Sequence, residues 1–438
     1  MPLTPLVLFE HETIPFNWTD RDLRLLAAIN GRAGDSILTP KIDAKGKQLQ
    51  AAQYVGVVRL GEQTIQILPK IHKSRERDTS AREATANLLH LLAYAADVPI
   101  DEQGVAPLLA KKSDWFEILI RLFATHMASL WQRGALHAYR AVDQELGVLK
   151  GKWRIADQLR YPASLHQFHV TSDEFTADTE INRALRFVVE RLWQLTCDGA
   201  NRRQLELLRE WMDGVTLPNA VNRAALDDAH ITRLNRAYVP VINLARMFLD
   251  GGALQLAADT TQTYSFVFDM NVLFESFVFR FLQRHRSQIL PEAAAQWKFV
   301  AQAGGCKLHL ALHQGIRNAF ALKPDIVARS GDRYPLLLDT KYKRLHPTKA
   351  ALGIDPADFY QMHAYATRYE CPRVILLYPQ TAEHPEPLCH TFRLQIGSAV
   401  IEARTIDLRC DLGKSSERAG LVQQLQNIFV ETTNPYVS

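Results

Sequence analysis

The sequence predicts a multidomain α/β (α+β) protein with three sections. Its 438 residues are too many for one ordinary hydrophobic core, so two or three domains are expected. Strand-like segments at both ends flank a middle part whose apolar residues recur at helical spacing. We therefore expect a β-rich N-terminal region at 1–75, a mainly helical middle region at 76–260, and a C-terminal domain with a mixed central sheet at 261–438.

The composition is that of a soluble globular protein, with 47% hydrophobic and 22% charged residues. The net charge of +4 permits nucleic-acid binding through local patches but does not predict it. Five scattered cysteines without a CxxC pair favour reduced thiols over a disulfide framework. No run of eighteen apolar residues occurs, and Glu10 interrupts the start too early for a signal peptide. We expect a cytoplasmic protein that does not associate with membranes.

The N-terminal section contains a predicted β-hairpin. "AQYVGVVRLGEQTIQILPKI" (52–71) indicates two strands joined near Gly61, because Ile65 and Ile67 alternate with Gln66. The middle section contains amphipathic helices. Two of them are "ATANLLHLLAYAA" (84–96) and one at about 114–134, where Asp114 followed by Glu117 resembles a capping box. Further helices are expected at the following ranges: 178–195, 202–213 and 228–250.

Strands and helices alternate in the C-terminal section. The expected strands are listed here by residue number: 307–313, 320–329, 334–343, 373–379 and a last one near 392–396. Helices are expected at 270–285 and 356–369. This alternation predicts helices packed on a mixed sheet.

An acid and a lysine follow a strand that is otherwise apolar. On a strand, Leu337, Asp339 and Lys341 share one face. Asp325 begins the preceding strand, and a turn around 331–332 would bring it opposite Asp339 in an antiparallel hairpin. Two carboxylates at that separation form a hard oxygen site suited to Mg²⁺.

The lysine extends this site from metal binding to chemistry. Lys341 could orient a water or stabilise negative charge in the transition state of phosphodiester hydrolysis. Taken alone, an acid-x-Lys pair at a strand end is most often a solvated ion pair. The interpretation as a site depends on the other features that accompany it.

Three such features surround the predicted site. Glu275 is the only acid on a helix that is apolar almost all round, so it needs a partner, either a metal site or a neighbour such as Arg280. Lys343 and Arg344 begin a basic run that could hold a phosphate backbone, or could be a solvated loop. The third feature is one helix face shared by Gln361 and Tyr365, which ordinary surface packing would also explain.

These motifs together resemble the PD-(D/E)XK nuclease superfamily. The Gln361-x-x-x-Tyr365 element is similar to the branch with RecB-type nuclease domains. More specifically, the chain resembles the McrC family, the nuclease subunits of modification-dependent McrBC restriction systems. The similar stretches are 268–278, 323–326, 336–343 and 359–366, with 55–71, 146–155 and 178–187 upstream.

The resemblance implies roles for particular residues. The expected catalytic residues are Asp325, Asp339, Lys341 and, as the acid of the preceding helix, Glu275. The expected Mg²⁺ ligands are Asp325, Asp339 and Glu275, and the expected DNA contacts are Lys343, Arg344, Gln361 and Tyr365. Thr340, between the acid and the lysine, is expected to point to the other face.

The resemblance also implies partners. McrC proteins act on double-stranded DNA with McrB, an AAA+ GTPase that binds the GTP and recognises methylated cytosine. The N-terminal region is expected to engage this GTPase and stimulate it. In the chain itself, "GVLKGKW" (147–153) comes nearest to a phosphate loop, but it lacks one spacer and the final Ser/Thr, so we expect no nucleotide site.

Two other functions remain open from the sequence. The chain could be a free-standing RecB-like repair nuclease, which would need no GTPase. It could also be a non-catalytic scaffold that activates a GTPase, with the acids and lysine in a structural role. The intact acid–lysine set favours the nuclease.

Overall fold

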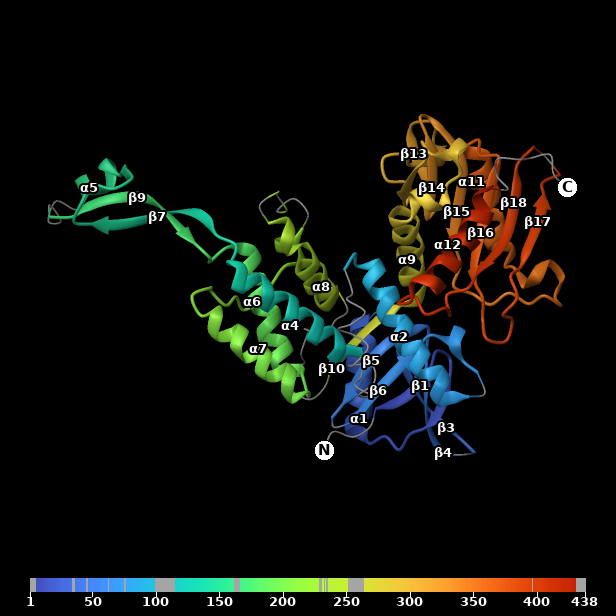
Figure 1. Ribbon diagram of the computed structural model, residues 1–438, viewed down its shortest axis with the longest axis horizontal. Helices are drawn as coiled ribbons and strands as arrows, with labels where there is room; N and C mark the ends of the chain where they lie inside the picture. The colour runs from blue at the N-terminus through green and yellow to red at the C-terminus, as the bar shows by residue number, and fades with distance from the viewer. Residues whose placement is uncertain are drawn as a thin grey trace. The chain divides into compact units, whose positions relative to one another are not determined.

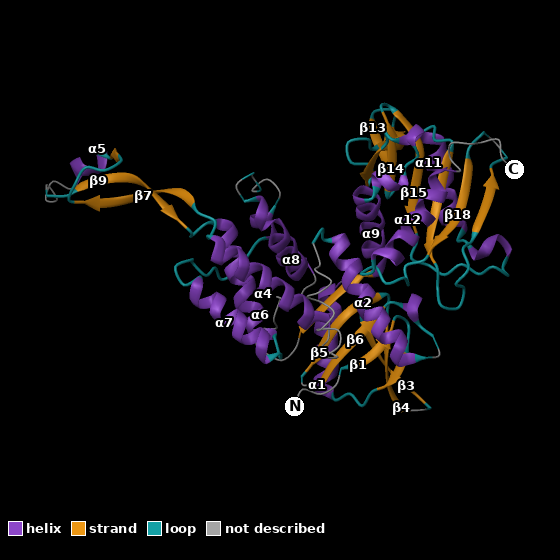
Figure 2. Ribbon diagram, in the orientation of Figure 1, coloured by secondary structure: helices purple, strands orange, loops and turns teal. Residues whose placement is uncertain are grey.

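The computed structural model describes the following residues: 5–33, 36–44, 46–61, 63–74, 76–98, 115–160, 166–227, 231, 233, 235–250, 264–395 and 397–430. The chain divides into two compact units (Figure 1). One unit combines residues 1–116 with 262–438, and the other contains residues 117–261. The predicted mixture of helices and several sheets is confirmed (Figure 2). The predicted section boundaries at 75/76 and 260/261 stay predictions.

A four-stranded sheet of order β1-β6-β5-β10 lies in the first unit. Its strands are β1 (Leu6–Phe9), β5 (Tyr54–Leu60), β6 (Gln63–Leu68) and β10 (Tyr264–Asp269). The predicted hairpin is confirmed as β5 and β6, while β10 comes from far along the chain and pairs antiparallel with β5. Gly56 permits this pairing, because a Cβ there would lie 2.2 Å from the carbonyl oxygen of Phe266.

A smaller sheet of order β2-β4-β3 and several helices complete the N-terminal part of this unit. Their bounds are β2 (Thr13–Pro15), β3 (Leu38–Asp43), β4 (Gly46–Ala51), α1 (Asp20–Ala33), the 3₁₀ turn η1 (Lys70–His72) and α2 (Arg77–Ala95). Leu26 and Ile29 of α1 pack with Leu49 and Ile65 in one apolar cluster. This shared cluster joins the small sheet to the four-stranded one.

The C-terminal part of the first unit contains a six-stranded mixed sheet of order β11-β14-β15-β16-β18-β17. The strands are β11 (Lys298–Ala301), β14 (Ile326–Ser330), β15 (Arg333–Thr340), β16 (Arg373–Pro379), β17 (Cys389–Arg393) and β18 (Val400–Ile406). β15, β16 and β18 run parallel, and the outer strands pair antiparallel, so the predicted mixed sheet is confirmed. A separate two-stranded hairpin consists of β12 (Leu308–His313) and β13 (Arg317–Leu322).

Helices pack around this sheet. They are α9 (Met270–Arg284), α10 (Arg286–Ile289), η6 (Glu292–Ala294), η7 (Ala350–Gly353), α11 (Pro356–Arg368) and α12 (Ser415–Val430). Both α9 and α11 contact β15. Met362 and Tyr365 of α11 share an apolar cluster with Leu337 and Val374. The strand face that carries Leu337 is therefore the face covered by α11.

Four long helices form the core of the second unit in its described residues. They are α4 (Trp115–Arg133), which begins at the junction with the first unit, α6 (Glu180–Leu195), α7 (Gly199–Trp211) and α8 (Val239–Asp250), with 3₁₀ turns η3 (Arg223–Leu226) and η5 (Arg236–Tyr238). The expected helices near 114–134, 178–195 and 202–213 are confirmed to within a few residues. The helix expected at 228–250 begins only at Val239, because Pro240 suits the first turn of a helix; residues 228–230 lie outside the described part. No helix described here is both long and apolar enough to cross a membrane.

A long hairpin in the second unit was not predicted. β7 (Ala138–Leu146) and β9 (Phe168–Thr176) pair over their whole length, with β8 (Lys152–Trp153) beside β9 and α5 (Ile155–Arg160) following. In Figure 1 it extends away from the helices of its own unit. Most β7 side chains are exposed on both faces, so the strand lacks the alternating apolar pattern that reveals strands in sequence.

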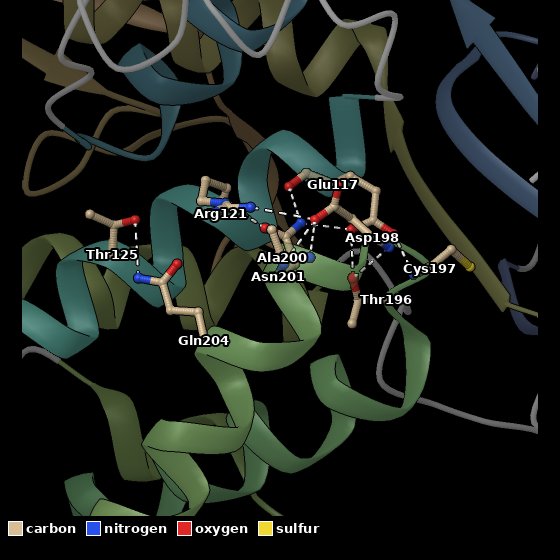
Figure 3. A network of polar contacts seen from close by, with 9 residues as sticks. All are labelled: Glu117, Arg121, Thr125, Thr196, Cys197, Asp198, Ala200, Asn201 and Gln204. Atoms are coloured by element: carbon tan, nitrogen blue, oxygen red, sulfur yellow. Dashed lines mark hydrogen bonds and ion pairs between the residues drawn. The ribbon is translucent and has the colours of Figure 1, made fainter.

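The base of α4 is fixed by a buried acid, Glu117 (Figure 3). Its carboxylate accepts hydrogen bonds from Thr196 Oγ1 (2.6 Å), Cys197 N (2.6 Å), Asp198 N (3.3 Å) and Asn201 Nδ2 (2.7 Å). The loop between α6 and α7 is thereby tied to α4. The expected capping partner, Asp114, lies outside the described residues.

Candidate active site

The two predicted acids lie at the ends of neighbouring strands. Ile326 pairs with Leu338 in the antiparallel ladder of β14 and β15, so the next step along the register places Asp325 opposite Asp339. This confirms the predicted hairpin geometry. Asp339 is 2% exposed, because the sheet and α11 cover the strand at this point.

Thr340 positions the first acid. Asp325 Oδ2 accepts hydrogen bonds from Thr340 N and Thr340 Oγ1, both at 2.7 Å. The backbone carbonyl of Asp325 accepts from Gln302 N at 2.8 Å. Thr340, to which the sequence analysis gave no role in the site, therefore orients the Asp325 carboxylate.

The predicted lysine contacts the second acid and α11. Lys341 Nζ lies 2.8 Å from Asp339 Oδ2 and 3.4 Å from Asp358 Oδ1, and it donates to Gln361 Oε1 at 3.2 Å. Gln361 Nε2 donates to the Tyr365 hydroxyl at 2.9 Å. The predicted pair on α11 is thus brought to the lysine, and Asp358 joins it as an acid that the sequence analysis did not select.

Burial and mutual repulsion disfavour the charged forms of these acids. Burial, with the nearby charge of Asp325, raises the pKa of Asp339 to about 7. Burial also raises the pKa of Asp325, although the Thr340 hydrogen bonds oppose the shift. Burial alone would lower the pKa of Lys341, but Asp339 and Asp358 reverse this and raise it. Opposed, desolvated carboxylates with a raised pKa suit a divalent cation. Its charge would offset both the loss of hydration and the repulsion between the two carboxylates.

Glu275 lies on α9 near these acids. Its Oε1 accepts a hydrogen bond from Gln302 Nε2 at 3.0 Å. Burial and the charge of Asp325 raise its pKa. Among the described residues, no three His, Cys, Asp or Glu side chains are arranged so that they could hold a metal ion. The third-ligand role of Glu275 therefore stays a prediction.

The predicted basic run is engaged in ion pairs. Lys343 Nζ lies 2.7 Å from Asp358 Oδ2. Arg344 Nη1 lies 2.9 Å from Glu383 Oε2. Both cations are near the site, but acids hold them in this structure.

A cluster that the sequence did not reveal adjoins Lys341. The Tyr342 hydroxyl donates to Glu10 Oε2 (3.0 Å), which also accepts from Lys70 N (2.9 Å). Lys70 Nζ donates to the Tyr342 carbonyl at 3.1 Å and lies over its ring. The turn after β15 is thus attached to the N-terminal sheets. No sequence signal identifies this contact, because Glu10 and Tyr342 are 332 residues apart.

The fold and this acid–lysine set define a mixed-sheet α/β protein with a candidate acid–lysine site. A family profile described as "McrBC 5-methylcytosine restriction system component" matches residues 49–379. The match covers more than half of the sequence, and the chain belongs to this family, which confirms the predicted family.

A solved structure supports the fold. The chain is similar to one in the refined half-complex from a tetradecameric assembly of Thermococcus gammatolerans McrB AAA+ hexamers with bound McrC. That match has 22% identity and a TM-score of 0.66, and it covers 97% of this chain and 100% of the other. A second match, to the cryo-EM structure of the Thermococcus gammatolerans McrBC complex, has 25% identity and a TM-score of 0.49, with 65% and 88% covered. No curated protein matches the sequence.

Proposed function

We propose that this chain is the Mg²⁺-dependent DNA endonuclease subunit of a GTP-dependent, modification-dependent restriction complex. The observation that carries the proposal is the pair of opposed acids, the partly buried Asp325 and the buried Asp339, with Lys341 at 2.8 Å from the second. Membership of the McrBC family supports the restriction role. The complex would act in the cytoplasm on methylated double-stranded DNA.

Each residue of the site has a proposed task. Asp325 and Asp339 would hold Mg²⁺, with Glu275 as the proposed third ligand. Bound Mg²⁺ would polarise the scissile phosphate and acidify a water. Thr340 keeps the Asp325 carboxylate in place through its two hydrogen bonds. Lys341 would stabilise the negative charge that develops on the phosphate, since its raised pKa keeps it protonated.

The flanking residues would bind DNA. Lys343 and Arg344 would exchange Asp358 and Glu383 for phosphate oxygens when a duplex arrives. Gln361 and Tyr365 would act from α11, where Gln361 already accepts from Lys341. Together they would hold the DNA backbone and the Lys341 ammonium in a fixed position relative to each other.

We further propose that the partner is an AAA+ GTPase, which would bind the GTP and the methylated base. The similar Thermococcus chain comes from an assembly of McrB AAA+ hexamers with bound McrC. The N-terminal region remains the predicted docking surface. The β7–β9 hairpin offers a second, because Tyr139 and Phe175 pair across it at 74% and 62% exposure. Large exposed apolar side chains gathered on one element favour a protein contact.

The test is cleavage of a methylated plasmid with Mg²⁺. Wild type and Asp339→Ala would be assayed alone and with the neighbouring AAA+ GTPase plus GTP, with GTP hydrolysis measured in parallel. Asp332→Ala is the matched control, because this aspartate lies on the same hairpin with a fully exposed side chain. We expect cleavage by wild type and control only with partner and GTP, and none by Asp339→Ala.

Other outcomes would support the alternative functions. Cleavage by wild type alone would favour a free-standing RecB-like nuclease. If neither wild type nor control cleaves DNA while both stimulate GTP hydrolysis, the chain is a scaffold that activates the GTPase. Equal cleavage by wild type and Asp339→Ala would show that the buried acids are structural.

A further inference from the structure

The hairpin β12–β13 is an exposed element that leads directly into the candidate site. It forms a sheet of its own, separate from the six-stranded one. Leu310, Leu312, Ile316 and Phe320 are 51–83% exposed on it. An isolated hairpin gains little from its own packing, so four large apolar side chains on its surface indicate a binding partner.

The charge of this segment indicates which partner. Residues 306–324 contain no aspartate or glutamate, but they contain Lys307, Arg317 and Lys323. None of these three cations forms an ion pair with an acid in the part of the chain that the structure describes. Lys343 and Arg344, by contrast, are both ion-paired. The unpaired cations of the hairpin therefore give it a positive charge that is complementary to a phosphate backbone.

The hairpin is close to the reacting end of the site. Leu322 and Asp325 are three residues apart, which limits their separation to about 11 Å. On α11, Arg368 Nε donates to the His309 carbonyl at 2.9 Å, while Gln361 contacts Lys341. The seven-residue step from Gln361 to Arg368 along α11 spans about 10 Å, so this separates the Lys341 contact from the hairpin contact. The same distance along one DNA strand corresponds to about three nucleotides.

Phe320 is the most unusual side chain of the hairpin. It is 74% exposed and has a φ of +56°, in the left-handed region that costs a non-glycine residue about 1 kcal/mol or more. The strand register omits it, since Ala319 pairs with Ala311 and Ala321 with His309. A strained aromatic that contributes to no core is suited to stack against an unstacked base step.

We propose that the β12–β13 hairpin is a DNA-contacting element beside the scissile phosphate. Lys307 and Lys323 bind phosphates within about three nucleotides of it, and Arg317, at the other end of the hairpin, binds a phosphate about five nucleotides farther along. Phe320 contacts a base step between them. The inference deepens the proposed function, on which it depends for the identity of the substrate.

The test is the salt dependence of duplex binding by the full-length chain. Binding of a labelled duplex would be measured between about 50 and 200 mM salt in an Asp339→Ala background, which prevents cleavage. The variants are K307A/R317A/K323A and, separately, F320A. Lys298→Ala is the matched control, because this exposed lysine lies at the end of β11 farthest from Asp325 in the register. Thermal melting would verify that each variant is folded, and Arg317→Gln alone replaces the triple variant if it is not.

We expect the triple variant to reduce the slope of log K against log salt by about 3, or by about 1 for Arg317→Gln alone. Phe320→Ala should weaken binding by about 10-fold with an unchanged slope, since base stacking contributes about 1–3 kcal/mol. GTPase stimulation should not change. An unchanged slope would overturn the proposal, and so would a loss of GTPase stimulation at an unchanged slope, which would make the hairpin a protein contact. Because binding is measured without cleavage, a failure of the proposed nuclease function can be distinguished from a failure of the proposed DNA contact by the hairpin.

Discussion

Glu117 and Asp339 are both buried acids, but their surroundings have opposite effects. Four donors surround Glu117, three from the loop between α6 and α7 and one, Asn201, from the first turn of α7. Asp339 instead faces Asp325, and burial with that repulsion raises its pKa to about 7. A carboxylate with a full set of donors stabilises a fold, whereas two opposed carboxylates with a single ammonium beside them still repel each other, and a divalent cation would relieve this repulsion. We expect this difference to distinguish a structural acid from a candidate functional one without reference to activity.

The largest expected effect comes from Asp339→Asn. Cleavage in the complete complex should fall by about 10³-fold or more, since metal activation supplies several kcal/mol.

In metal-free protein at pH 8 the same variant, Asp339→Asn, should be as stable as wild type, or more stable, because it removes the repulsion with Asp325. Thermal melting with EDTA and then with Mg²⁺ checks both points. Mg²⁺ at about 100 times its Kd should stabilise wild type by about 2.7 kcal/mol, and the variant much less. A variant that melts far below wild type in EDTA would contradict the comparison.

Glu117→Ala should have the opposite effect. It leaves several buried donors without an acceptor, so the free energy of unfolding should fall by about 3–5 kcal/mol. Urea denaturation followed by circular dichroism measures this loss. Glu206→Ala is the control, since Glu206 is exposed on the neighbouring α7 and should change stability by less than about 0.5 kcal/mol. Equal stabilities of Glu117→Ala and Glu206→Ala would show that Glu117 does not stabilise the fold.

Glu10 provides an intermediate case. Its Oε2 accepts two hydrogen bonds, while Oε1 accepts none in the described structure. Burial raises its pKa to about 7, although Lys70 opposes the shift. An acid whose pKa is raised on folding contributes stability below its unfolded pKa near 4.5, and this is lost as the pH rises through about 7.

The Glu10→Gln variant does not titrate, so it isolates this effect. Relative to the variant, wild type should lose up to about 3 kcal/mol of stability between pH 4.5 and pH 7. Urea denaturation of both proteins across this range measures the difference. A constant difference at every pH would show that Glu10 is ionised in the folded protein.

The smallest expected effect is at the exposed margin of the site. Lys343 is half exposed and paired with Asp358, so Lys343→Ala should cost the fold less than about 1 kcal/mol. Cleavage should weaken by about 10-fold or less, with a salt slope for DNA binding reduced by about 1. A loss of cleavage as large as that of Asp339→Asn would contradict this and show that Lys343 takes part in the reaction itself.

Local patterns were sufficient to predict the acid–lysine hairpin. Alternation along β15 and the turn at Gly331 fixed the faces, and the register then brought Asp325 opposite Asp339. The same reasoning found Gln361 and Tyr365, because helical spacing places them on one side of α11. Such features depend only on residues close in sequence.

Contacts between distant segments could not be predicted. Glu117 suggested a helix cap, but its partners come from a loop about 80 residues later. The exposed β7–β9 hairpin was missed because it buries no alternating face. Glu10 and Tyr342 meet through tertiary packing alone, which no periodicity encodes.

The pairing of β10 with β5 has a consequence for biosynthesis. Tyr264 pairs with Arg59, so 264 − 59 = 205 residues separate the two edges that meet in the N-terminal sheet. At about 5–20 residues per second, a ribosome needs roughly 10–40 s to supply the missing strand. During this interval the apolar edge of β5 lacks its native neighbour and is open to pairing with other chains. The second unit, contiguous in sequence, is completed first, so folding of the nascent chain proceeds from the inserted unit to the one that encloses it in sequence.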